Sequence, residues 1–357
     1  MHKPNKKTYH GLDSVRGAAA LLVVVYHSAL IYGSPLASSG YLAVDLFFAL
    51  SGFVIAHSYD ERLGTNLSAM RFIFLRAIRF WPLYVIGLAI GASYEILLIL
   101  THNSFALPLG VVASYIITNI LFVPYFFKSR FNSVFPLNGP SWSLFAELVV
   151  NVAYAIFIRY LSRRVLIMII LLSGVCVGFD AIRFGSLDVG FSTTNFWAGI
   201  ARAVFSFSVG IYLYRDQWRT KLIPMYATIT AVVVALLLPV PTTIRPFYDL
   251  SFAFIISPCI VIAATSEVPP GLTRRVGHLL GEVSFAVYAI HRPLLNYAET
   301  LVKRTHIPRE LSVIIFIIGV TFLALLLHRA VDAPIRRWLS SRLGLRNVPK
   351  PLEQSAP

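Results

Sequence analysis

The chain has 357 residues, of which 57% are hydrophobic and only 13% are charged, and its formal net charge is +15. Because soluble domains carry charge on about one quarter of their residues, this composition excludes an ordinary soluble protein. The excess of Lys and Arg would suggest nucleic-acid binding in a soluble chain, but in a membrane protein such residues collect in the cytosolic loops.

Long apolar runs recur along the chain from residue 17 to residue 327. A run of about 20 apolar residues can cross a bilayer as a helix, which satisfies its own backbone hydrogen bonds where water is absent. The sequence therefore predicts an all-α polytopic membrane protein with about ten transmembrane helices. We expect these spans at 12–33, 38–58, 80–100, 141–160, 164–180, 195–214, 222–240, 247–265, 279–299 and 309–329.

One further apolar stretch, 108–124, is shorter and contains Pro108 and Pro124. If it does not cross, 22 Lys and Arg residues fall on the side of the N-terminus and 7 fall on the other side. If it crosses, the two totals become 15 and 14. The positive-inside rule therefore favours ten spans with both termini in the cytosol, and a segment 108–124 that is re-entrant or lies at the outer interface.

The domain organisation that follows is simple. We expect one transmembrane domain at 12–338, between a basic cytosolic tail at 1–11 and a polar cytosolic tail at 339–357. The two cysteines, Cys176 and Cys259, lie inside apolar runs far apart in the sequence. They predict packing residues, with no disulfide framework and no metal site.

Ionisable residues interrupt the predicted spans, although each costs about 2.5–3.5 kcal/mol at a helix centre. Counted at 1.5 Å per residue from the nearer span end, they lie roughly 6–12 Å below the outer surface, in one layer. We expect them to face the bundle interior and to pair, and a purely structural layer of salt bridges remains open for the charged members. These residues are His27, Asp45, Glu147, Arg202, His291 and Arg292.

Arg16 and His27 are eleven positions apart in the first predicted span. At about 100° per residue they share one helical face, separated by roughly 16 Å along the axis. A guanidinium suits a phosphate or a carboxylate, and an imidazole suits general-base or acyl-carrying chemistry near neutral pH. We therefore expect Arg16 at the cytosolic mouth and His27 at the chemical step, with Glu147 or Asp45 holding the tautomer or charge of the imidazole.

Several segments share a resemblance to one family. The run from Leu12 to Gly17, continuing to His27, is similar to the opening motif of the acyltransferase-3 family of membrane O-acyltransferases: a basic residue, ten others and then His. Asp332 stands where Glu is expected, and Phe285 stands where Tyr is common. The other matching segments follow the family's order, namely its second span, its Arg-x-x-Arg, Trp-Ser-Leu-x-x-Glu and Ser…Tyr…His-x-Pro motifs and its closing motif: Val44–Phe53, Arg76–Tyr84, Pro140–Glu147, Gly281–Pro293 and Val331–Pro334.

This resemblance implies transfer of an acyl group, usually acetyl from acetyl-CoA, to a hydroxyl of a cell-surface or exported glycan at the bacterial cytoplasmic membrane. Acyl-CoA would be a donor substrate, with no permanently bound cofactor and no metal. Arg76 and Arg79 share a helical face and would grip the donor phosphates, although ordinary positive-inside anchoring remains an alternative. Four other side chains are predicted to bind substrate: Trp142, Arg202, Tyr288 and His291.

The implied partners are acyl-CoA, a glycan or lipid-linked glycan and the lipid bilayer, with no nucleic acid. Two alternatives stay open. Buried His, Asp, Glu and Arg within ten spans also suit a proton-coupled transporter, although the sequence shows no repeated halves. Some members of the family acylate small molecules such as macrolides, so the acceptor need not be a glycan. The sequence contains neither a Gly-x-Ser-x-Gly nucleophile elbow nor a Gly-rich phosphate loop.

Overall fold

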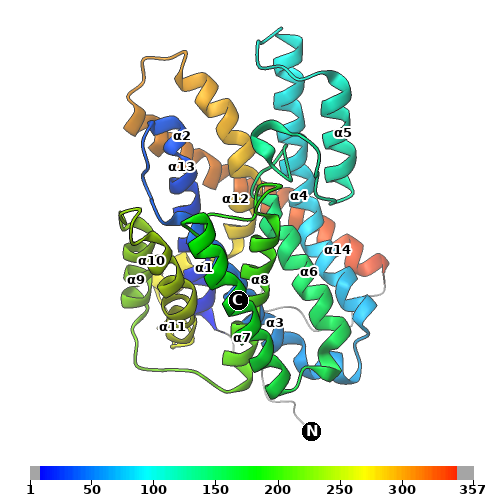
Figure 1. Ribbon diagram of the computed structural model, residues 1–357, viewed down its shortest axis with the longest axis vertical. Coiled ribbons are helices and arrows are strands. Elements are labelled where there is room, and N and C mark those ends of the chain that lie inside the picture. Colours follow the sequence, from blue (N-terminus) through cyan, green and yellow to red (C-terminus); the bar gives the residue numbers. More distant parts are fainter. Residues whose placement is uncertain (1–8, 344–357) are drawn as a thin grey trace.

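Helices account for the architecture of the chain. The computed structural model describes residues 9–343, and within that range no strand occurs and one isolated bridge joins Ser133 to Ser192. The short helices α2 and α5 lie at the same end of the bundle, called here the α5 end (Figure 1). The helices are α1 (His10–His27), α2 (Ala29–Tyr32), α3 (Ala43–Thr65), α4 (Ala69–Leu100), α5 (Leu109–Ile120), α6 (Ser141–Phe157), α7 (Arg163–Phe184), α8 (Phe196–Arg215), α9 (Met225–Leu237), α10 (Arg245–Ser251), α11 (Ser257–Ala263), α12 (Leu272–Val302), α13 (Arg309–Leu327) and α14 (Ala333–Arg342).

Each predicted span coincides with one of these helices or with two consecutive ones, so the prediction of an all-α polytopic membrane protein is confirmed. Eight helical segments of the described chain are long and apolar enough to cross a membrane. The other two predicted spans correspond to α9, which has 13 residues, and to α12, which has 31 residues and includes several charged side chains.

Helix α9 nevertheless extends between the two ends of the bundle. A Cβ atom added at Gly11, at the start of α1, would lie 2.6 Å from the methyl carbon of Met225, the first residue of α9. At the other end of α9, the amide of Ser39 donates to the carbonyl of Leu236. Ser39 belongs to the loop that joins α2 to α3 at the α5 end. The short helix therefore extends beside α1 from the start of α1 to the loop at the α5 end, which is the path that the ten-span topology requires.

Helices α1 and α12 pack closely and run in parallel. A Cβ atom added at Gly17 would lie 2.5 Å from the Cβ atom of Leu280, and one added at Gly277 would lie 1.9 Å from the Oγ atom of Ser14. Small residues let helix backbones approach in a membrane, where dispersion contacts replace the hydrophobic effect. This packing aligns the full length of α1, including His27, with α12.

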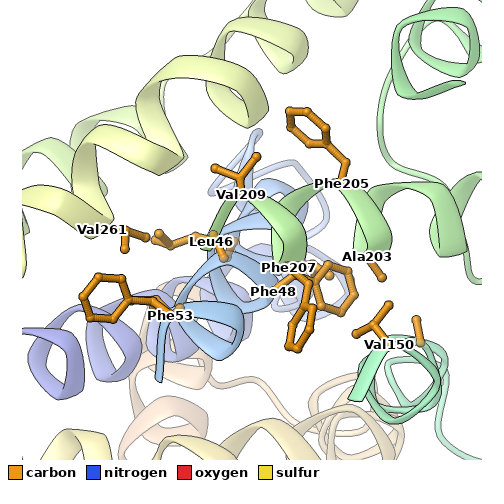
Figure 2. Close-up of a cluster of buried hydrophobic side chains, with 14 of the residues drawn as sticks. Leu46, Phe48, Phe53, Val150, Ala203, Phe205, Phe207, Val209 and Val261 are labelled. Carbon is orange, nitrogen blue, oxygen red and sulfur yellow. The ribbon is translucent and has the colours of Figure 1, made fainter. Parts of the chain in front are cut away.

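A second close pair is formed by α3 and α8, which also run in parallel. A Cβ atom at Gly52 would lie 2.0 Å from the carbonyl oxygen of Phe207, and one at Gly210 would lie 2.1 Å from that of Ala49. Around this contact, apolar side chains of α3, α6, α8 and α11 form the main buried cluster (Figure 2). Its labelled members are Leu46, Phe48, Phe53, Val150, Ala203, Phe205, Phe207, Val209 and Val261.

Helix α5 supports the prediction that 108–124 does not cross. It starts at the α5 end and descends until the carbonyl of Asn119 accepts a hydrogen bond from Tyr84, in the middle of α4. The chain then returns, because Arg130 pairs with Glu95 close to the end of α4, at 2.9 Å. This path is that of a re-entrant segment.

Several predicted boundaries differ from the structure, and two of the differences affect the site or the domain limits. Helix α4 begins at Ala69, so the stretch before 80, expected as a cytosolic connection, is already part of a 32-residue helix. Helix α14 continues to Arg342, beyond the predicted domain boundary at residue 338. The remainder of the two predicted tails, 1–8 and 344–357, lies outside the described residues.

Candidate active site

The imidazoles of His27 and His291 meet between α1 and α12. Atom Nδ1 of His27 lies 3.2 Å from Nε2 of His291, and the ring centroids are 5.0 Å apart. Nδ1 of His27 also lies 3.0 Å from the carbonyl oxygen of Val23, one turn earlier on α1. On the other ring, Nδ1 of His291 lies 3.1 Å and 2.9 Å from the carbonyl oxygens of Val287 and Tyr288.

These contacts determine which nitrogen of each neutral ring carries the proton. Carbonyl oxygens only accept, so Nδ1 of His291 must donate, which leaves its Nε2 as an acceptor. Nδ1 of His27 then faces two acceptors, Nε2 of His291 and the carbonyl of Val23, and must itself be the donor. The Nε2 atom of His27 is left with a lone pair, and it makes no hydrogen bond within residues 9–343. This is the protonation state that a general base requires.

The two histidines differ in accessibility. His27 is partly exposed, whereas His291 is completely buried, at 0% exposure. A reactant can therefore reach His27 and cannot reach His291 in this conformation. The structure does not support the predicted substrate contact of His291 and instead places this side chain behind His27, where it orients the imidazole.

A proline explains how α12 is anchored at this point. Pro293 has no amide hydrogen, so the carbonyl of Ala289, one turn earlier, loses its usual helical partner. The side-chain amide of Asn138 donates to that carbonyl at 2.8 Å. The segment that leads into α6 is thereby tied to α12 beside His291, and an otherwise unsatisfied polar group is paired within the membrane.

Asp45 and Arg202 form a buried ion pair that does not involve His27. Two guanidinium nitrogens of Arg202 lie 2.6 Å and 3.1 Å from the carboxylate of Asp45, and both side chains are 1% exposed. Two further N–H groups of Arg202 donate to the carbonyls of Val189 and Tyr41, and the ring of Trp142 lies 5.7 Å from the guanidinium carbon. Four of the five N–H donors of Arg202 are thus used and its side chain is closed off from solvent, so the geometry assigns Asp45, Arg202 and Trp142 to structure.

Glu147 also lies away from His27. Its carboxylate accepts from Ser51 at 2.6 Å and pairs with Arg76 at 3.0 Å. These ionisable groups therefore do not form one connected cluster: they divide into a histidine pair, a buried Asp45–Arg202 pair and a Glu147–Arg76 pair. Because α4 already begins at Ala69, Arg76 is inside the bundle and meets Glu147 there. Neither predicted carboxylate holds the tautomer of His27.

A cavity of about 630 Å³ opens on the opposite side of the bundle from the α5 end. Its lining includes three carboxylates, from Asp13, Glu147 and Glu282. It also includes five arginines, from α1, α4 and α14: Arg16, Arg76, Arg79, Arg336 and Arg337. Arginine outnumbers carboxylate, so this cavity attracts an anion. Its size lies within the range of roughly 300–1,000 Å³ that is typical of small-molecule sites.

Arg16 is held at this cavity by three contacts. It pairs with Asp13 at 2.8 Å, donates to Ser284 at 3.1 Å and donates to the carbonyl of Gly281 at 3.2 Å. The last two partners are on α12. Arg16 and His27 thus lie along the same pair of helices, as their spacing predicted, with Arg16 at the cavity and His27 farther in.

The cavity is lined by neither histidine, but it reaches Tyr288, which lies beside His291. Phe47, Ser143 and Tyr288 line it. The hydroxyls of Ser143 and Tyr288 are 2.6 Å apart, and the ring of Tyr288 lies 5.7 Å from the ring of His291. An elongated ligand whose anionic part lies among the arginines would therefore extend toward Tyr288 and the imidazoles.

Comparison with known proteins identifies the family. Residues 9–329 match the family model described as an acyltransferase domain. The chain belongs to the acyltransferase-3 family. Protein 2 of the picA locus of Rhizobium radiobacter is 39% identical over 184 residues, which cover 48% of this chain and 94% of that protein. Acyltransferase MdmB of Streptomyces mycarofaciens is 23% identical over 388 residues, covering 97% of this chain and 96% of its own. No solved structure matches.

The protein is thus a multi-pass membrane acyltransferase, and the transporter alternative loses its basis.

The sequence did not single out two groups of this acyltransferase. Arg336 and Arg337 were counted only as cytosolic charge, yet both line the cavity. Tyr26, next to His27, donates to Asp188 at 2.7 Å. Burial raises the pKa of Asp188, although the hydrogen bond from Tyr26 opposes the shift. Asp188 lies in a loop between spans, where no periodicity marks it.

Proposed function

We propose that this acyltransferase moves an acyl group, acetyl in the simplest case, from acyl-CoA to a hydroxyl of a cell-surface or exported glycan. The proposal places the cavity on the cytosolic side of a bacterial cytoplasmic membrane, with both termini in the cytosol and the α5 end outside. The observation that carries it is the alignment of an arginine-rich cavity, Tyr288 and the histidine pair along α1 and α12.

The donor would bind with its phosphates among the cavity arginines. Guanidinium groups form strong, often bidentate hydrogen bonds to phosphate. Arg76 is already committed to Glu147, and Arg16 to Asp13, so these two would add mainly positive potential. Arg79 and Arg337 also line the cavity and would contact the phosphates, Arg337 from an exposed position. The pantetheine arm, being thin and weakly polar, would extend past Phe47 with the thioester beside Tyr288.

His27 would act as the general base. Its Nε2 atom takes the proton of the acceptor hydroxyl, and the oxygen attacks the thioester carbonyl. The carbon–sulfur bond breaks, the new ester is released, and the proton passes to the CoA thiolate, so the reaction is balanced. His291 accepts the hydrogen bond from Nδ1 of His27, so the proton of the neutral ring stays on Nδ1. The same neutral acceptor faces the imidazolium that forms. A positioned base of this kind contributes about 10²–10⁴-fold to the rate.

Release of CoA tests the proposal. Purified protein in detergent would be supplied with acetyl-CoA, with and without a glycan extract, and free CoA would be measured by chromatography. We expect glycan-dependent release that is lost in His27→Ala and retained in Arg164→Gln, a change of an exposed arginine outside the cavity. Glycan-independent thioester binding without any turnover would contradict the proposal. NMR of surface glycans from cells with and without the gene would distinguish a glycan acceptor from a small molecule.

A further inference from the structure

Arg292 is a cation of α12 that the mechanism above does not use. Its guanidinium donates to the side-chain oxygen of Asn296, one turn later, and no carboxylate of residues 9–343 lies within 4.0 Å of it. Arg16, Arg76 and Arg202 differ in this respect, because each of them pairs with a carboxylate. An arginine within a membrane span is costly unless an anion compensates its charge.

The position of Arg292 connects it to the proposed chemistry. It follows His291 directly on α12, and His291 contacts His27, so the charge of Arg292 lies near the histidine pair. Because its guanidinium reaches forward to Asn296, the charge lies toward the α5 end, on the side of the histidine pair away from the donor cavity. That is the side from which an external acceptor would approach.

Arg292 begins a polar strip along α12. Arg292, Asn296 and Thr300 are spaced at four-residue intervals, so they share a helical face. The hydroxyl of Thr300 lies 3.0 Å from that of Tyr94 on α4, and all four side chains are partly exposed. Tyrosine, amide and hydroxyl groups together can hydrogen-bond a carbohydrate, and the guanidinium has further N–H donors beyond the one that Asn296 uses.

We propose that this strip binds the acceptor and that the acceptor carries an anionic group, a phosphate or a carboxylate, which pairs with Arg292. The inference rests on the proposed function, since it assumes that the hydroxyl to be acylated is presented to His27 from the α5 end. It goes further by specifying an acidic or phosphorylated glycan as the substrate class. A guanidinium matches both oxyanions with two parallel hydrogen bonds.

Binding of small anionic sugars tests this assignment without depending on turnover. The protein would be purified in phospholipid-free nonionic detergent and saturated with CoA, so that the donor cavity is occupied. Glucose 1-phosphate and methyl glucuronide are the probes, and glucose is the neutral control. We expect at least one anionic probe to bind saturably, glucose not to bind, and Arg292→Gln to weaken binding by about tenfold or more. The matched change Arg304→Gln, at an exposed position near the same end, should leave binding unchanged.

Three outcomes would overturn the proposal: neither anionic probe binds, a probe binds equally well to Arg292→Gln, or only a lipid occupies the site. The last is read from nanodiscs of phosphatidylglycerol and of phosphatidylcholine. Stabilisation by phosphatidylglycerol that requires Arg292, without sugar binding, would make Arg292 a lipid anchor.

His27→Ala separates this inference from the proposed function, because it should bind the anionic probe normally. Normal probe binding by a wild-type protein that shows no acyl transfer would contradict the proposed function alone.

Discussion

His27 and His291 form an imidazole pair, with 3.2 Å between Nδ1 of the first and Nε2 of the second, and no carboxylate of residues 9–343 forms an ion pair with either ring. Orientation of a catalytic histidine by an aspartate, as in serine hydrolases, places a negative charge behind the ring. Here a neutral ring, itself oriented by two backbone carbonyls, occupies that place. The pair therefore fixes the tautomer without adding a charge to the membrane interior.

The first prediction concerns His291. Replacing it with Leu should lower kcat by roughly 100-fold, while KM for donor and acceptor stays near the wild-type value, because the buried ring touches His27 and no substrate. His291→Gln should recover part of the rate, since its amide oxygen can accept from Nδ1 of His27. Steady-state kinetics on protein of matched purity gives the measurement.

A double-mutant cycle provides the control for that prediction. If His291 acts through His27, the variant that lacks both should be no slower than His27→Ala alone. Additive losses, or an increase in the acceptor KM of His291→Leu, would instead support the original expectation that His291 binds substrate.

The sequence allowed some of this site to be predicted, for physical reasons that can be stated. Helix geometry is local, so the eleven-residue spacing correctly placed Arg16 and His27 along one helix line. The depth of a residue along its helix can also be estimated from the sequence. That depth does not predict which neighbouring helix the residue contacts. Asp45 and Arg202 are 157 positions apart, and their contact depends on the close packing of α3 against α8.

The same reasoning explains the histidine partner that was missed. His291 was recognised by its motif, but its contact with His27 requires α1 and α12 to approach through glycines, which no single-helix pattern reveals. Glu147 was misplaced for a different reason. Because α4 starts at Ala69, Arg76 lies inside the bundle, and its long side chain reaches Glu147 there.

The second prediction separates structural from functional carboxylates. Asp45→Ala leaves the buried charge of Arg202 without a partner, which should cost roughly 3–5 kcal/mol and reduce the yield of folded protein. Changing both residues together, Asp45→Leu with Arg202→Met, should restore much of the yield. Fluorescence-detected size exclusion of tagged variants gives the measurement.

Glu147→Ala is the comparison for that experiment. Its partner Arg76 borders the cavity, where water can solvate the guanidinium, so the loss of yield should be smaller than for Asp45→Ala. Equal yields for the two single variants would show that the Asp45–Arg202 pair does not contribute to folding as its burial indicates.

The third prediction concerns the donor cavity. Arg79→Gln and Arg337→Gln should each raise KM for acetyl-CoA by about tenfold or more with little change in kcat, because each removes a charge-assisted contact to phosphate. Arg76→Gln is a poorer probe, since it also leaves Glu147 without its ion pair. Arg164→Gln is the reference variant. An unchanged KM in both cavity variants would indicate that these arginines serve only as ordinary membrane anchors.

The last prediction is the topology, which depends on where α9 and α5 end. The background would lack Cys176 and Cys259, which are exposed in the structure and are not the packing residues that the sequence predicted. Single cysteines would then be introduced at exposed loop positions. Lys128→Cys, after α5, and Thr243→Cys, after α9, should react with a membrane-impermeant maleimide added to intact cells. Lys221→Cys, before α9, should react only after the membrane is permeabilised.

Each label decides one part of that topology. Protection at Lys128→Cys would mean that 108–124 crosses the membrane, which would abolish the charge asymmetry that supports cytosolic termini. Protection at Thr243→Cys alone would mean that the 13-residue α9 returns without crossing, despite its contacts at both ends of the bundle. Because a helix of 13 residues rises only about 20 Å, less than the roughly 30 Å of a hydrocarbon core, α9 can cross only if its flanking residues or a locally thinned bilayer make up the difference. Labelling at Thr243→Cys with protection at Lys221→Cys is therefore the most demanding outcome of the ten-span arrangement, and it is the one that the positions of Met225 and Leu236 lead us to expect.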